Sequence, residues 1–232
     1  MKDENEFSIV IPIYEGVDLL DVTIPYEVFN WVNNISDKSN ESDKRTLRVY
    51  TVAETDCNIA TRDSFKLVPD FDFSTFEQNS IQTKLIWVPG GKPESLNAQM
   101  NNSAFKQFIR RQSEIAEYVV SVCEGALLLA DAGLLDGYYA TTHWAFKPCL
   151  EKYKNVKVAE GFPRYVIDGN RITGGGVSSG LDESLAIIQL LNGTELAKQV
   201  QKSIQYLPDP PVSVELQATT VCPLDKYNTM HE

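Results

Sequence analysis

The chain has 232 residues, of which 43% are hydrophobic and 23% are charged. These values are typical of one large or two small globular domains. A formal net charge of −11 argues against nucleic acid and anionic membrane surfaces as partners, because both carry negative charge themselves.

The first fifty residues predict two buried strands separated by a helix. Phe7–Ile13 is apolar on both faces, as in a buried parallel strand. Helical spacing follows from about Asp21 to Val32, with Pro25 expected in the first turn, where a missing N–H costs nothing. Residues 33–45 are polar and predict an exposed loop. Leu47–Ala53 is the second strand.

The rest of the chain repeats the alternation of strands and helices. Strands are expected at Lys84–Val88 and Tyr118–Val122, and a hairpin within Tyr165–Thr173, where Asp168-Gly169 is a turn signal. Helical spacing predicts helices at residues 103–117, 126–132, 143–153, 181–191 and 194–206. An irregular tail is expected from about residue 207, where prolines gather.

This alternation predicts a single α/β domain over residues 1–232, with a mainly parallel twisted sheet and helices on both faces. In such sheets, ligands bind at the carboxyl ends of the strands. Unusual segments follow three of the expected strands, namely Pro89-Gly90-Gly91, Cys123-Glu124-Gly125 and Gly174-Gly175-Gly176. We expect these segments to converge with the start of the helix at Asp21.

Cys123 is the strongest candidate for chemistry. It lies between a strand and a helix, with Gly125 two residues later, which is similar to a nucleophile elbow with Cys in place of Ser. A strained turn would direct the thiol into the cleft, and the helix N-terminus would lower its pKa. A buried, inert cysteine is the alternative interpretation.

Asp21, His143, Gly91 and Glu124 are the other candidates. Asp21 is either a helix N-cap or a proton donor and acceptor facing Cys123. His143 either packs beside Trp144 or borders the pocket, and Gly91 belongs to a turn or offers an N–H to developing negative charge. Glu124 is either solvated or part of the pocket wall, where it would disfavour anionic substrates.

The remaining cysteines, Cys57, Cys149 and Cys222, are expected to be inert. They are far apart, with no CxxC motif and no Cys/His cluster, so no metal site is expected. The N-terminal sequence does not resemble a signal peptide, and no stretch approaches the roughly 20 apolar residues of a membrane span. We therefore expect a cytoplasmic protein with reduced thiols.

Four segments of the chain resemble the DJ-1/PfpI superfamily, in the order found there. Val122–Trp144 (VCEGALLLADAGLLDGYYATTHW) is the longest and most specific motif. Leu20–Phe29 (LDVTIPYEVF), Val88–Gly91 (VPGG) and Arg171–Asp182 (RITGGGVSSGLD) support it. The similarity is greatest to the isonitrile hydratase branch and to the amidase-like domains of AraC-type regulators. It implies a flavodoxin-like sandwich with a nucleophile elbow.

The resemblance also implies roles for individual residues. The nucleophile falls on Cys123, the acidic partner on Asp21 and the oxyanion-stabilising glycine on Gly91, helped by the N–H of Glu124. Gly175, in the glycine-rich motif, is expected beside the pocket. Hydratases usually carry threonine where this chain has Glu124, and glyoxalase-like and DJ-1-like members usually have Glu where it has Asp21.

The implied reaction is hydration of a small neutral isonitrile to an N-substituted formamide, without metal or organic cofactor. A glyoxalase-like activity on small carbonyl compounds and a thiol-oxidation sensor remain alternatives. A DNA-binding regulator is not expected, because little chain follows residue 206 and the protein is acidic. Family resemblance also implies a homodimer, with the aromatic stretch Tyr26–Trp31 as a possible contact surface.

Overall fold

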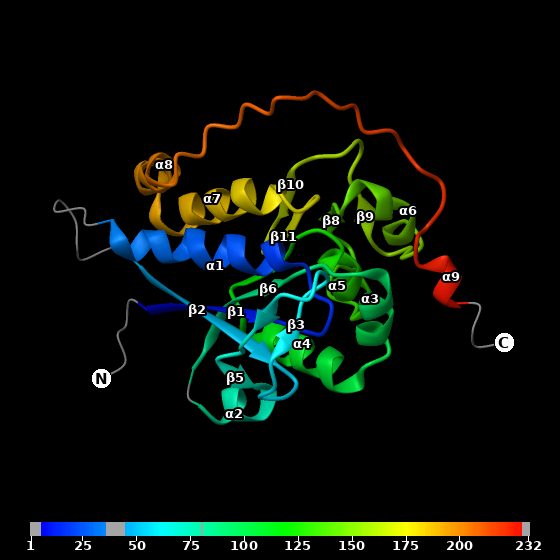
Figure 1. Cartoon of the computed structure of the whole chain (residues 1–232), viewed down its shortest axis with the longest axis horizontal. Coiled ribbons are helices and arrows are strands. Elements are labelled where there is room, and N and C mark those ends of the chain that lie inside the picture. The colour runs from blue at the N-terminus through cyan, green and yellow to red at the C-terminus, as the bar shows by residue number, and fades with distance from the viewer. Residues whose placement is uncertain (1–5, 36–44, 80, 229–232) are drawn as a thin grey trace.

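A central, mainly parallel sheet confirms the predicted fold class (Figure 1). The computed structural model describes residues 6–35, 45–79 and 81–228. All pairings in the seven-stranded sheet are parallel except that of β10 with β11, the predicted hairpin. In spatial order, the strands are β10 (Tyr165–Asp168), β11 (Arg171–Gly174), β7 (Tyr118–Ser121), β6 (Thr83–Val88), β1 (Glu6–Pro12), β2 (Thr46–Ala53) and β5 (Phe71–Asp72).

Helices cover both faces of this sheet (Figure 1). One face carries α1 (Leu19–Asn34), α7 (Ser179–Asn192) and α8 (Thr194–Ser203). The other face carries α4 (Ser103–Ile115) and α5 (Gly125–Asp131). The smaller elements are β3 (Ile59–Ala60), β4 (Lys66–Leu67), α2 (Phe73–Gln78), α3 (Pro93–Met100), β8 (Tyr139–Ala140), the 3₁₀ turn Trp144–Phe146, α6 (Lys147–Leu150), β9 (Lys157–Val158) and α9 (Asp225–Asn228).

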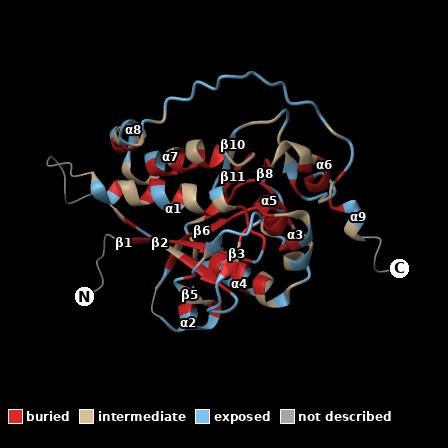
Figure 2. Ribbon diagram, viewed as in Figure 1, coloured by how far each residue is buried: buried red, intermediate tan, exposed pale blue. Residues whose placement is uncertain are grey.

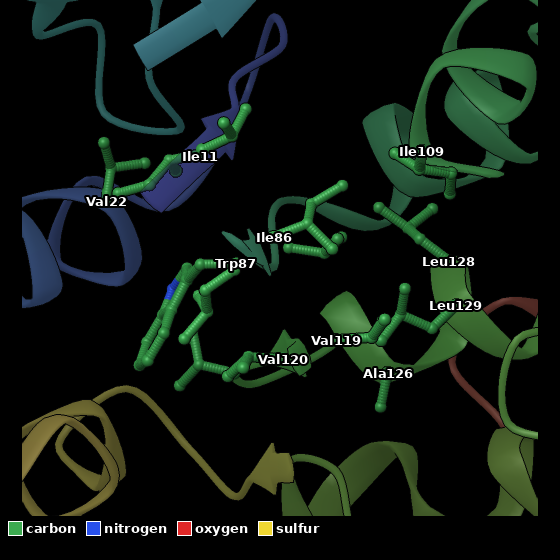
Figure 3. Close-up of a cluster of buried hydrophobic side chains, with 14 of the residues drawn as sticks. Ile11, Val22, Ile86, Trp87, Ile109, Val119, Val120, Ala126, Leu128 and Leu129 are labelled. Carbon is green, nitrogen blue, oxygen red and sulfur yellow. The ribbon is translucent and has the colours of Figure 1, made fainter. Parts of the chain in front are cut away.

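The core lies between the sheet and its two helical layers (Figure 2). Successive side chains of β6 point to opposite faces, as the pleat requires. Ile86 faces Ile109 of α4 and Leu128 of α5, whereas Trp87 faces α1 and α7 (Figure 3). Both residues are fully buried, and β6 is the middle strand of the seven, at the segment where the sequence predicted a strand.

The sheet positions the candidate site by aligning three strand ends. Val88 of β6 pairs with Ser121 of β7, and Ser121 pairs with Thr173 of β11. The segments that follow, which begin at Pro89, Val122 and Gly175, therefore leave the sheet side by side. β1 lies next to β6 and pairs with β2 on its other side, so the strand order reverses between β1 and β6. Such a switch point is where open α/β sheets bind ligands.

Several predicted boundaries differ from the observed ones. α1 begins at Leu19, so Pro25 lies inside the helix and not in its first turn. The segment 143–153, predicted as one helix, consists of the 3₁₀ turn and the single turn of α6. The sequence predicted no elements between residues 54 and 83, where the structure has the six-residue helix α2 and the strands β3, β4 and β5, which have only two residues each.

The expectation that all four cysteines are reduced is wrong for two of them. Cys149 and Cys222 form a disulfide across a separation of 73 residues. The tail is irregular from about residue 207, as predicted, but it arches over the molecule from α8 to α9 and so brings Cys222 to α6 (Figure 1). Within the described residues, none of the helices has both the length and the apolar character that a membrane crossing requires.

Candidate active site

Cys123 lies on a nucleophile elbow. Its φ angle is 56°, in the left-handed region that L residues other than glycine rarely adopt. Two hydrogen bonds hold this conformation, since Cys123 N–H donates to the Gly175 carbonyl at 2.7 Å and the Cys123 carbonyl accepts from Thr142 Oγ1 at 2.8 Å. A Cβ atom at position 125 would lie 2.0 Å from the Val88 carbonyl oxygen, so the turn requires Gly125. The predicted strain at Cys123 is confirmed.

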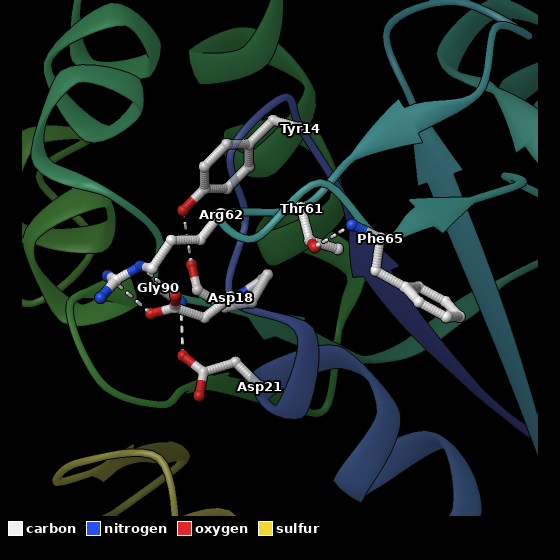
Figure 4. A network of polar contacts seen from close by, with 8 residues as sticks. Tyr14, Asp18, Asp21, Thr61, Arg62, Phe65 and Gly90 are labelled. Atoms are coloured by element: carbon white, nitrogen blue, oxygen red, sulfur yellow. Dashed lines mark hydrogen bonds and ion pairs between the residues drawn. The ribbon is translucent and has the colours of Figure 1, made fainter.

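Asp21 is not an N-cap. It lies in the first turn of α1 and is 1% exposed. Its Oδ2 accepts a hydrogen bond from the Gly90 N–H at 2.9 Å (Figure 4), whereas Oδ1 has no partner among the described residues. The helix therefore presents Asp21 to the loop after β6.

Glu124 is part of the site and is not solvated. Its side chain is 3% exposed and accepts a hydrogen bond from the Cys123 thiol. The carboxyl packs against Gly90, where a Cβ atom would lie 2.4 Å from Glu124 Oε2 and 3.0 Å from Asp21 Oδ2. Two carboxyl groups therefore flank the thiol, and the absence of a side chain at Gly90 makes room for both.

A third carboxyl group, that of Asp18, completes the cluster. One potential ligand atom each from Asp18, Asp21, Cys123 and Glu124 lies within 4.8 Å of the others. Asp18 already forms an ion pair with Arg62, with Nε–Oδ1 and Nη2–Oδ2 distances of 2.6 and 3.0 Å (Figure 4). Within the part of the chain that the structure describes, no Lys, Arg or His forms an ion pair with the other two carboxyls, Asp21 and Glu124.

The electrostatics of this cluster contradict the predicted low pKa of Cys123. Burial, and then the charges of Asp21 and Glu124, hold the pKa of the Cys123 thiol well above its usual range. Burial likewise raises the pKa of Asp21 well above its usual range, with Asp18 and Glu124 adding to the effect. Burial raises the pKa of Glu124 to about 7. The prediction failed because it considered the N-terminus of α5 and not the carboxyls around the thiol.

Gly91 stands next to the amide that binds Asp21. It forms an isolated antiparallel bridge with Val17, in which Asp18 N–H donates to the Gly90 carbonyl and Lys92 N–H donates to the Gly16 carbonyl. Among the described residues, the Gly91 N–H has no hydrogen-bond acceptor. Gly91 itself is buried.

A pocket of about 510 Å³ lies beside the elbow, between the N-terminal ends of α1 and α7. His143 and Gly175 both line it, as predicted, together with apolar side chains and Leu216 of the tail. The His143 Nδ1 accepts a hydrogen bond from Ala145 N–H at 3.3 Å, and burial lowers the pKa of His143. The neutral ring therefore carries its proton on Nε2. Cys123 does not line this pocket and is 1% exposed, so a ligand reaches the thiol only if the wall between them moves.

Sequence reasoning missed three residues of the site. Tyr14 is buried and donates to the Pro89 carbonyl at 3.0 Å, and Arg62 pairs with Asp18 (Figure 4). Trp87 donates from Nε1 to the backbone carbonyl of Asp21 at 2.9 Å. A signal existed only for Trp87, because a proline four residues after Asp21 leaves that carbonyl without its helical donor.

Several known proteins are similar in sequence to more than half of this chain. Isonitrile hydratase of Pseudomonas putida is 34% identical over 199 residues, which cover 86% of this chain and 78% of that protein. The HTH-type transcriptional regulator GbdR of Pseudomonas aeruginosa is 25% identical over 212 residues, and the match covers 88% of this chain but 52% of the regulator. DJ-1alpha of Drosophila melanogaster is 31% identical over 129 residues, or 54% of this chain and 56% of that protein.

Solved structures share the fold. A ThiJ/PfpI family protein from Pseudomonas syringae has a TM-score of 0.76 and 28% identity, covering 89% of this chain and 78% of the other. DJ-1beta of Drosophila melanogaster has a TM-score of 0.72 at 19% identity, covering 86% and 98% of the two chains. The model of the DJ-1/PfpI family matches residues 7–190, and the chain therefore belongs to the DJ-1/PfpI family.

Proposed function

We propose that this protein hydrates a small, neutral isonitrile to an N-substituted formamide, with Cys123 as the nucleophile. The observation that carries the proposal is the strained, buried thiol flanked by two carboxyls with raised pKa values, Asp21 and Glu124. The similarity to isonitrile hydratase of Pseudomonas putida supports the choice of substrate class.

The first half of the reaction forms a thioimidate. The Cys123 thiol transfers its proton to the Glu124 carboxylate, which already accepts its hydrogen bond. The resulting thiolate attacks the terminal carbon of the isonitrile, and Asp21 protonates that carbon as the C–S bond forms. The product is R–N=CH–S–Cys123, and the proton held by Glu124 passes back to Asp21. A group with a pKa of about 7 suits this exchange, because general acid–base catalysis is most effective near the operating pH.

The second half releases the formamide. The Glu124 carboxylate removes a proton from water as the oxygen adds to the imidate carbon. Asp21 gives its proton to the nitrogen and regains one from Glu124. The tetrahedral adduct R–NH–CH(OH)–S–Cys123 then expels the thiolate, its hydroxyl proton returns to sulfur, and R–NH–CHO leaves. The free Gly91 N–H is the donor that we assign to the developing oxyanion.

Pocket chemistry supports a neutral, apolar substrate. The side chains of Leu20, Ile24, Phe162 and Leu181 line the pocket beside the elbow. The acidic cluster around Cys123 would repel an anionic substrate.

A side-by-side assay tests the proposal. Wild type and Cys123→Ala are given an aryl isonitrile and, separately, methylglyoxal. We expect the wild type to turn over the isonitrile and the variant to turn over neither. Turnover of methylglyoxal alone would reject the hydratase proposal.

A glyoxalase-like activity on small carbonyl compounds is the second candidate. One observation favours it, since Glu124 places a glutamate carboxyl in hydrogen-bond contact with the thiol. A thiol-oxidation sensor is less well supported, because oxidation requires an accessible thiolate and the Cys123 thiol is buried and protonated.

We also propose that the protein is a homodimer. Of the aromatic stretch suggested by the sequence, Tyr26 is 41% exposed and Trp31 is partly buried, whereas Phe29 is fully buried and cannot contact a partner. Light scattering at micromolar concentration should give twice the mass of the chain, and a monomer would contradict the proposal.

A further inference from the structure

Pro25 leaves one backbone carbonyl of α1 without its helical donor. In an α-helix, the N–H of each residue bonds to the carbonyl four residues earlier. Pro25 has no N–H, and its ring crowds the carbonyl at that position, which is the carbonyl of Asp21. Asp21 is 1% exposed, so water cannot readily replace the lost donor. A buried carbonyl without a partner is costly.

The indole of Trp87 supplies the missing donor. Its Nε1–H donates to the Asp21 carbonyl at 2.9 Å, and the ring stands between the sheet and α1 (Figure 3). Three residues later, the Gly90 N–H donates to the Asp21 carboxylate, also at 2.9 Å. The main chain and the side chain of Asp21 are therefore both held by residues 87–90.

We propose that Trp87 is a positioning residue. By donating a hydrogen bond to the backbone carbonyl of Asp21, which Pro25 leaves without a helical donor, it holds the Asp21 carboxyl against the Cys123 elbow. This inference rests on the role of Asp21 in the proposed function. An ordinary helical hydrogen bond would tie that carbonyl only to α1, whereas the indole ties it to β6. Since the loop after β6 packs against Glu124, the bond couples the position of Asp21 to that of the elbow.

The titration of Cys123 reports on this placement. Asp21 faces several titratable or charged groups, from its own helix start, the elbow, the loops and α7. These groups are Tyr14, Asp18, Arg62, Cys123, Glu124 and Glu183. The charge of Asp21 contributes to the raised pKa of Cys123, so a displaced carboxyl must alter the pH dependence of thiol reactivity.

The test uses a substitution and a double variant that supplies the carbonyl with a different donor. Trp87→Phe removes the N–H but keeps an aromatic ring, while Pro25→Ala restores a helical N–H at the position that faces the Asp21 carbonyl. For Trp87→Phe we expect kcat for the isonitrile to fall about tenfold with KM within about twofold. We also expect the midpoint pH for alkylation of Cys123 to move by about half a unit or more. The double variant gives the Asp21 carbonyl a donor within α1 but no link to β6, so it should keep both changes of Trp87→Phe to within about twofold.

Controls separate positioning from packing. The Phe29 ring packs edge-on against the Trp87 ring, with 5.9 Å between the ring centroids. Phe29→Leu therefore disturbs the same packing without removing the hydrogen bond, and it should leave the alkylation midpoint unchanged. If Trp87→Phe does not fold, replacement of Trp87 by 3-benzothienylalanine removes the N–H at nearly constant shape. Alkylation is read by mass spectrometry and needs no substrate, so it tests this inference even if isonitrile is not turned over. An unchanged midpoint in the Trp87 variants, or a double variant that regains the wild-type midpoint, would overturn it.

Discussion

The Glu124 carboxyl lies beside the Cys123 thiol and accepts a hydrogen bond from it. These two residues are neighbours in the sequence, and yet both side chains enter the same buried site because Cys123 adopts a positive φ angle. Asp21 approaches the same thiol from α1. The active site that we propose is therefore a thiol between two carboxyls from different elements.

Glu124→Gln should reduce the dependence of stability on pH in a range where the wild type weakens. Burial raises the pKa of Glu124 to about 7 from a usual value near 4.5, so the folded state holds a proton that the unfolded state has released. The free energy of unfolding therefore falls as pH rises from about 4.5 to 7, by on the order of 3 kcal/mol for this group alone. Urea denaturation at pH 5, 6, 7 and 8 should show this loss in the wild type and a smaller loss in Glu124→Gln. Equal losses in both would contradict the assignment.

Thiol reactivity should change in the same variant. Because the charge of Glu124 helps to raise the pKa of Cys123, Glu124→Gln should shift alkylation of Cys123 to lower pH. Cys57 is exposed and serves as an internal reference in the same sample. An unchanged profile, read for each cysteine by mass spectrometry, would show that Glu124 does not influence the thiol.

Asp21→Asn should lose most of the activity without losing the fold. The amide keeps the shape of the side chain and can still accept from the Gly90 N–H, but it cannot transfer a proton. Removal of a general acid–base group typically costs about 10²–10⁴ in rate. His143→Ala should cost less, since His143 lines the pocket and is not among the groups clustered at the thiol. A larger loss for His143→Ala than for Asp21→Asn would reverse these roles.

Much of this site could be predicted from local sequence. The order of strand, Cys123, Gly125 and helix placed the thiol at an elbow, because a tight turn there leaves no space for a side chain at Gly125. The predicted parallel sheet also placed Asp21 near Cys123, because the carboxyl ends of parallel strands lie at the same edge of the sheet.

The rest depends on contacts between distant segments. Arg62 reaches Asp18 from a region of two-residue strands, which has no periodicity to detect. The pKa of Cys123 was predicted in the wrong direction because burial and the carboxyl of Asp21, about a hundred residues away, outweigh the short helix α5. Cys149 and Cys222 were predicted to be reduced because they are 73 residues apart in the sequence and only the path of the tail brings them together.

The disulfide should stabilise the protein by tethering the tail. Cys222→Ser should lower the free energy of unfolding by about 2–4 kcal/mol under oxidising conditions. It should also release Leu216 from the pocket wall and make the tail more sensitive to limited proteolysis. The exposed Cys57 provides the matched control, and Cys57→Ser should change neither property. Equal stability of Cys222→Ser and wild type, with and without reductant, would contradict a structural role for the bond.

Covalent capture of the isonitrile carbon by Cys123 tests the central claim most directly. Acid-quenched wild type, mixed with an aryl isonitrile, is examined by intact-protein and peptide mass spectrometry, with Cys123→Ser as the control. The account predicts a mass increase equal to the whole isonitrile, located on Cys123, together with its absence in the variant and appearance of the formamide only with the wild type. Formamide production by Cys123→Ser at the wild-type rate would contradict it.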